Sequence, residues 1–113
     1  MTPPTFEPRD PAFEARVRDD FARQGAMRSF GARLVRVGPG CVQIEQDWAA
    51  GLTQQDGFLH GGVVSAVMDT ACGFAALTLM APGAGVLTVE FKVNFVAPAR
   101  TAGLRAVGQV LKS

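Results

Sequence analysis

The feature that most constrains this chain is its apolar stretch FLHGGVVSAVMDTACGFAALTLM, residues 58–80, which carries a single charge, Asp69. The stretch predicts one long buried helix from about His60 to Met80. A Pro and two Gly residues within 81–85 end that helix. A buried carboxylate costs several kcal/mol unless it is paired or changes its pKa. Asp69 is therefore a candidate nucleophile or general base, or else a structural acid held by backbone or hydroxyl groups such as Thr70.

A membrane span is the main alternative for this stretch, because residues 61–86 are long enough to cross a bilayer. The acid near its middle is costly in hydrocarbon, and no Lys or Arg lies just outside either end. A helix buried in a globular protein explains the same pattern. We therefore expect no membrane association.

Composition and charge exclude several other classes of function. The chain has 113 residues, 48% of them hydrophobic, which is enough for one domain with one core. Its net charge of +1 gives no indication of nucleic-acid binding. Cys41 and Cys72 have neither metal-ligand spacing nor the number needed for a disulfide framework. The N-terminal residues MTPPTFEPRD do not resemble a signal peptide, so a reduced, cytoplasmic protein is expected.

The N-terminal segment, residues 1–28, predicts a lead-in and an amphipathic surface helix. Asp10 and Pro11 are typical of a helix start. Phe13, Val17 and Phe21 form a narrow apolar stripe, and the helix is expected to end near Gly25. Residues 29–113 then form the main domain.

Alternating apolar and polar residues predict two β-hairpins, one on each side of the long helix. The first begins at Ser29, turns at residues 38–40 and returns over 41–48, and a slip in its pattern near Leu34 indicates a bulge or a strand buried on both faces. The second pairs the clearest strand of the chain, residues 87–95, with residues 104–111.

Four antiparallel strands around one apolar helix form an α+β fold. The chain ends at VGQVLKS, in or just after a strand, so the natural domain is expected to continue beyond it.

The segments HGGVVSAVMDTACG and LTVEFKVNFVAPA together resemble the hotdog-fold acyl-CoA thioesterases of the PaaI-like family. The resemblance covers residues 29–111. It implies a hotdog fold, in which an antiparallel sheet wraps around one long central helix, here without its last strands. It also implies homodimers, often homotetramers, that hydrolyse acyl-CoA thioesters with no metal or other cofactor.

The spacing of Gly61 and Asp69 bears on how such a site is built. Helix N-termini offer free N–H groups, so Gly61 could polarise a thioester carbonyl, or its lack of a side chain could serve only packing. Gly61 and Asp69 lie about 12 Å apart along a helix at about 1.5 Å per residue. One helix cannot easily bring both to one reaction centre. We therefore predict active sites shared between two subunits of a homodimer.

Other candidate site residues surround this pair. His60 either contacts substrate or the loop, or caps the helix; a Cys72–His60 pair would be about 18 Å apart along the helix. The resemblance implies an amide role for Gln54, where the family often has Asn, and a water-holding role for Thr88. Gly62 is a candidate substrate contact. Arg100, Arg105 and Lys92 could meet the phosphates of CoA, although solvated surface charges explain them better.

Three rival functions remain at this point: an acyl-binding hotdog module without activity, a hotdog hydratase or dehydratase, and the membrane protein discussed above. The identity of the acyl group is not encoded in any motif.

Overall fold

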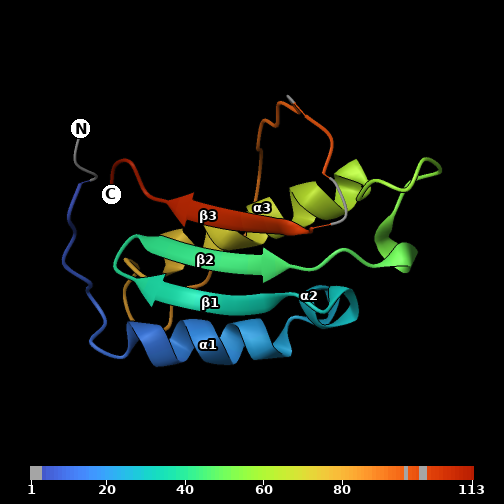
Figure 1. Cartoon of the computed structure of the whole chain (residues 1–113). Helices are drawn as coiled ribbons and strands as arrows, with labels where there is room; N and C mark the ends of the chain where they lie inside the picture. The colour runs from blue at the N-terminus through green and yellow to red at the C-terminus, as the bar shows by residue number, and fades with distance from the viewer. Residues whose placement is uncertain (1–3, 96, 100–101) are drawn as a thin grey trace.

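A computed structural model describes residues 4–95, 97–99 and 102–113 of the chain. A three-stranded antiparallel sheet of order β1-β2-β3 packs against one long helix, α3, which runs behind the sheet in Figure 1. The elements are α1 (Phe13–Arg23), α2 (Gly25–Phe30), β1 (Arg33–Gly38), β2 (Cys41–Gln46), the short 3₁₀ helix η1 (Ala50–Leu52), α3 (Gly61–Leu77) and β3 (Leu104–Gln109). The expected sheet-and-helix architecture of a hotdog fold is confirmed.

The first hairpin has the predicted turn and bulge. β1 and β2 pair from Gly38 opposite Cys41, and the register shifts between Leu34 and Arg36. The alternation in β2 places Val42 and Ile44 in the core, since successive side chains of a strand point to opposite faces. β2 ends at Gln46, two residues earlier than expected.

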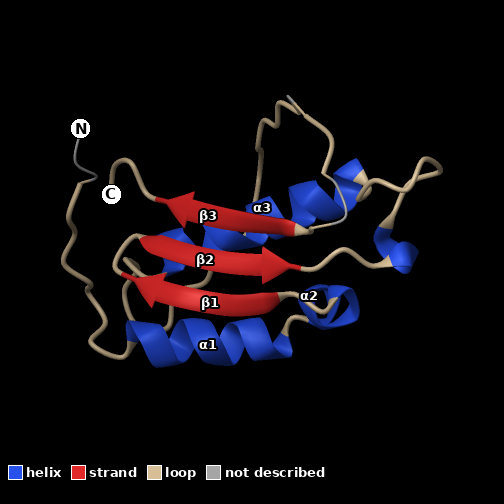
Figure 2. Cartoon of the chain, in the orientation of Figure 1, coloured by secondary structure: helices blue, strands red, loops and turns tan. Residues whose placement is uncertain are grey.

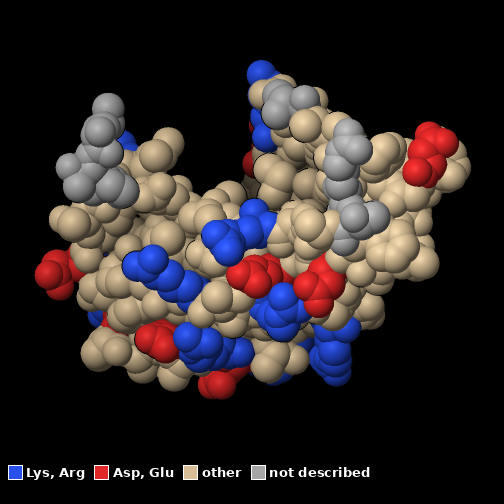
Figure 3. Space-filling view, viewed as in Figure 1, with Lys and Arg blue, Asp and Glu red and all other residues tan. Residues whose placement is uncertain are grey.

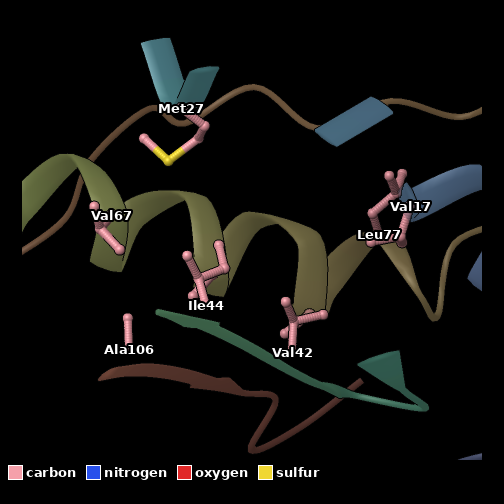
Figure 4. Close-up of a cluster of buried hydrophobic side chains, with 9 residues drawn as sticks. Val17, Met27, Val42, Ile44, Val67, Leu77 and Ala106 are labelled. Carbon is pink, nitrogen blue, oxygen red and sulfur yellow. The ribbon is translucent and has the colours of Figure 1, made fainter. Parts of the chain in front are cut away.

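The core lies between the sheet and α3. Val67 and Leu77 of α3 belong to this core; Figure 4 shows Leu77 beside Val17 of α1, and Ala106 opposite the helix. The helix and β3 approach very closely: a Cβ built on Gly108 would lie 2.2 Å from the carbonyl oxygen of Ala71. Small residues at this crossing therefore allow the sheet to curve onto the helix.

The N-terminal segment forms two helices instead of the single one expected. The carboxylate of Asp10 accepts the N–H of Ala12 at 2.8 Å, and α1 begins at Phe13. The chain breaks at Gln24 and continues as α2, so Ser29 and Phe30, which were expected to begin a strand, are helical. The six residues of α2 are too few for a recognisable 3.6-residue period, and the burial of its Met27 stabilises it.

The boundary expected at residues 28–29 lies inside α2. Val17 of α1 and Met27 of α2 both belong to the core (Figure 4). The N-terminal helices and the sheet therefore share one hydrophobic core.

The predicted strand over residues 87–95 is wrong for this structure. Figure 2 shows the chain between α3 and β3 as loop, and Leu87 and Val89 are 88% and 94% exposed. β3 pairs only with β2, so the second hairpin is absent from the described residues. Alternating side chains favour a strand, but its backbone N–H and C=O groups also need a neighbouring strand, which no described segment supplies.

The C-terminal end of α3 is joined to distant parts of the chain. The Arg16 guanidinium on α1 donates to the carbonyl oxygens of Leu77, Met80 and Ala81 at 2.9, 3.2 and 2.8 Å. The buried Thr78 hydroxyl donates to Ala75 and accepts the N–H of Gly40 at 2.7 Å. These bonds satisfy carbonyl groups that helix ends leave without partners.

The outward face of the sheet carries interspersed acidic and basic side chains (Figure 3). Arg33 of β1 pairs with Asp47 at 2.8 Å, and Arg105 of β3 pairs with Glu45 at 3.7 Å. Within the described ranges, no helix is long and apolar enough to cross a membrane.

Candidate active site

The N-terminal end of α3 presents one free backbone donor. His60 caps the helix: its Nδ1 accepts the N–H of Gly62 at 2.8 Å, and its carbonyl accepts those of Val63 and Val64. The N–H of Gly61 has no partner among the described residues. Of the two predicted roles for His60, the structure supports the capping role. The N–H of Gly62 is already used by that cap, which removes it as a substrate donor.

A cavity of about 430 Å³ opens beside this donor. Its lining is mostly apolar and consists of Gln54, Phe58, Leu59, Gly61, Val64, Phe95, Ala97, Pro98 and Ala99. Gln54 thus lies in the same cavity as Gly61, as expected. Its side-chain oxygen accepts the N–H groups of Asp56 and Phe58, which fixes the preceding loop and directs the amide. The cavity can accept an apolar group beside a free N–H, the arrangement that polarises a carbonyl.

Asp69, further along the helix, has a hydroxyl partner that was not expected. Thr88 Oγ1 donates to Asp69 Oδ1 at 2.7 Å, and Asp69 is half-buried. The hydroxyl partner of Asp69 is therefore Thr88 and not Thr70. The two residues line a second cavity of about 290 Å³ with Gln24, Thr70, Gly73, Phe74, Val86 and Leu87.

The two cavities have no lining residue in common. Eight residues of continuous helix separate Gly61 from Asp69, about 12 Å at about 1.5 Å per residue. Within one chain the structure brings Gln54 to Gly61 and Thr88 to Asp69, but it does not bring these two pairs together.

The remaining candidate residues lie outside the two cavities or outside the described part of the chain. Arg100 lies outside the described residues. Arg105 pairs with Glu45 on the outward face of the sheet. Cys72 is exposed; partial desolvation of its thiol and then the nearby Asp69 carboxylate raise the pKa of Cys72, so it carries less thiolate than an ordinary cysteine.

Gln24 is a candidate site residue that the sequence did not indicate. Its side chain lies in the cavity of Asp69 and accepts a hydrogen bond from Thr70. Gln24 is 45 residues from Asp69 in an otherwise ordinary surface helix pattern, so no local signal in the sequence could have identified it.

The sequence and fold are similar to those of known thioesterases. Residues 56–113, just over half of the chain, match the family model of the thioesterase superfamily. A crystal structure of a thioesterase family protein from Silicibacter pomeroyi is 49% identical, with a TM-score of 0.86 over 88% of this chain and 74% of that one. The PaaI protein of the E. coli phenylacetic acid degradation operon is 16% identical with a TM-score of 0.77 (86% and 69% covered), a likeness of fold alone.

A provisionally named esterase of Saccharolobus solfataricus is 29% identical over 71% of this chain. The chain spans 56% of the length of that relative.

The chain belongs to the thioesterase superfamily. Within that superfamily, its helix, sheet and structural neighbours confirm a hotdog fold of the PaaI-like kind.

Proposed function

We propose that this protein hydrolyses acyl-CoA thioesters to the free acid and CoA. The observation that supports this most directly is the pair of incomplete half-sites on one helix. Gly61 offers an unpaired N–H beside an apolar cavity, and Asp69 lies with Thr88 beside another. An electrophile-binding group and an acid are the two elements that thioester hydrolysis requires.

In the proposed reaction, the thioester carbonyl oxygen accepts the Gly61 N–H, which stabilises the negative charge that develops on it. Asp69 takes a proton from a water molecule as the water oxygen bonds to the carbonyl carbon. The C–S bond then breaks, and the departing sulfur receives the proton that Asp69 holds. Thr88 keeps the carboxylate oriented through its hydrogen bond.

We propose further that two subunits complete each site. A two-fold axis that places the Gly61 end of one α3 beside the Asp69 region of its partner yields two equivalent sites. The separation of the two cavities within one chain supports this arrangement, because neither cavity alone holds both groups.

The first test is the release of free thiol from a panel of acyl-CoAs. We expect turnover with at least one member, and a fall in kcat of about a hundredfold or more in Asp69→Asn, since general bases contribute about 10²–10⁴ in rate. The matched control is Asp19→Asn, at an exposed position on α1. Turnover that survives Asp69→Asn refutes the role of this acid, and absence of turnover in the wild type favours an acyl-binding module.

The second test addresses the shared site. Gly61→Pro removes the N–H, and Asp69→Asn removes the base. A mixture of these two variants should form heterodimers that contain one complete site, so activity should reappear on mixing. A purified heterodimer without activity contradicts the shared arrangement.

A hydratase or dehydratase is less well supported. That chemistry typically needs an acid and a histidine at one substrate, whereas the Nδ1 of His60 is already used to cap the helix.

A further inference from the structure

We propose that Gln24 positions the attacking water in the Asp69 cavity, a role that rests on the proposed function. Its side-chain amide would supply the hydrogen bond to the water oxygen, while Asp69 removes a proton. Gln24 would thus link the N-terminal helices to the chemistry at the middle of α3.

The break between α1 and α2 places this residue. Gln24 has an extended backbone (φ −80°, ψ 104°) between two helical segments, so the chain changes direction there. Its Oε1 accepts the hydroxyl of Thr70 at 3.1 Å, and Thr70 is only 9% exposed. This bond between α3 and the break holds the amide at the wall of the cavity that contains Asp69 and Thr88.

The NH₂ group of the Gln24 amide is available to donate hydrogen bonds into the cavity. Because Oε1 accepts from Thr70, the NH₂ group of Gln24 is left over, and it has no partner among the described residues. Asp69 as a carboxylate can only accept hydrogen bonds. The Thr88 hydroxyl donates its one hydrogen bond to Asp69, so toward any further group its oxygen can only accept.

A water molecule in this cavity can therefore donate one proton to Asp69 and the other to Thr88. Its oxygen needs a donor, and Gln24 is the one lining side chain of the described cavity with unpaired N–H groups. With three groups holding it, the water keeps one lone pair for the carbonyl carbon. Gln24 exchanges no proton in this step; the proton goes to Asp69 and later to the departing sulfur.

The first variant is Gln24→Met, which keeps the length of the side chain but removes both N–H donors together with the oxygen that accepts from Thr70. We expect kcat to fall about tenfold to hundredfold, since small misplacements of reacting groups cost about that much. KM and the affinity for a non-hydrolysable thioether analogue of the best acyl-CoA should change less than threefold. Gln55→Met, in the exposed loop before α3, is the matched control and should match the wild type.

A second variant, Gln24→Glu, separates this role from a structural one. It keeps an acceptor for Thr70 but offers no donor, so it should remain as slow as Gln24→Met. Wild-type kcat in Gln24→Glu would overturn the proposal. A parallel loss of melting temperature and analogue affinity in Gln24→Glu, which keeps the bond to Thr70, would also overturn it, by showing that Gln24 acts only through folding.

The two proposals fail in different ways. If the wild type releases thiol from no acyl-CoA, the proposed function fails and this inference fails with it. If the wild type is active and Gln24→Met is equally active, only the role of Gln24 is refuted.

Discussion

The two ends of α3 differ in how completely their backbone groups are bonded. At the C-terminal end, Arg16 bonds the helix carbonyls and Thr78 bonds the adjoining turn, while at the middle of the helix Gly108 lets β3 lie directly on Ala71. At the N-terminal end, Gly61 keeps an unpaired N–H beside a cavity. One helix therefore combines a bonded end that stabilises the fold with an open end available to a ligand.

This contrast makes different predictions for substitutions at the two ends. Changes near the C-terminal end, or where β3 crosses the helix at Ala71, should lower the free energy of unfolding and leave the kinetics of the folded protein intact. At the N-terminal end, changes that obstruct the Gly61 N–H should lower activity and leave stability intact, whereas loss of the His60 cap should lower stability.

The largest effect is expected from Gly108→Ala. The new Cβ would lie 2.2 Å from the Ala71 carbonyl oxygen, so β3 must move away from α3. We expect a loss of about 3 kcal/mol in the free energy of unfolding, at the upper end of overpacking penalties, measured by urea denaturation. Gly25→Ala is the control: its Cβ meets nothing within 4 Å, and it should be neutral or slightly stabilising. Equal stability of the two variants would contradict the close crossing.

Arg16→Met should lower the free energy of unfolding by about 2 kcal/mol. The substitution keeps an apolar stem but removes the donors that reach three carbonyl oxygens, and hydrogen bonds from charged groups are each worth about 1.5–3 kcal/mol before water replaces them. Arg18→Met, at an exposed residue of the same helix, is the matched control. A fall in kcat without a fall in the free energy of unfolding would contradict this purely structural role of Arg16.

Gly61→Ala should separate activity from folding. The added methyl would lie 3.5 Å from the ring of Phe95, an ordinary contact, and Ala favours helix, so stability should be unchanged or higher. The methyl nevertheless narrows the approach to the free N–H. We expect kcat/KM for thioester hydrolysis to fall about tenfold, less than the 10²–10³ that follows complete loss of such a donor. Unchanged kinetics would show that ligands do not approach this end.

His60→Ala should cost about 1 kcal/mol of stability, the typical value of a helix cap, because the bond from Gly62 to Nδ1 is lost. His60→Asn supplies another capping acceptor and should recover most of that loss. Both variants should retain kcat within about tenfold, well short of the loss that follows removal of a general base. A large fall in kcat in His60→Asn would instead indicate that His60 contacts the substrate.

The smallest effect concerns Cys72. Partial burial and then the Asp69 carboxylate raise the pKa of its thiol, so less thiolate is present at pH 8 than for an ordinary cysteine. Alkylation of Cys72 in the native protein should therefore be slow and should accelerate as pH rises past the ordinary thiol range. Asp69→Asn removes the second contribution, lowers the pKa and should speed alkylation a few-fold at pH 8. An unchanged rate would show that the carboxylate does not act on the thiol.

The elements that the sequence predicted well are those whose side-chain pattern and backbone bonding agree locally. α3 has its cap, apolar interior and terminating Pro-Gly within one stretch, and the hairpin of β1 and β2 has its turn at residues 38–40. The break at Gln24 and the absence of a strand over 87–95 were not predicted. Both depend on whether distant segments provide packing or pairing, which alternation alone does not encode.

The same division applies to the candidate site. His60, Gly61 and Asp69 could be selected from one apolar helix because a lone acid and a glycine-rich start are local features. The resemblance implied that Thr88 holds water; its hydrogen bond to Asp69 is a contact that only the structure shows. The placement of Gln24 depends on a helix that folds back over α3 from far away in the chain.

By itself, the sequence determined that one long apolar helix packs against an antiparallel hairpin and carries both a glycine-rich start and an acid, because periodicity, capping and breakers act over a few residues. Only the tertiary structure decided at which end of that helix the backbone groups are hydrogen-bonded to other elements and at which end an N–H stays unpaired. Arg16 and the N–H of Gly40 reach one end across long stretches of chain, and no described side chain reaches the Gly61 N–H at the other. Such contacts arise from how the chain folds back on itself, so no local pattern records them.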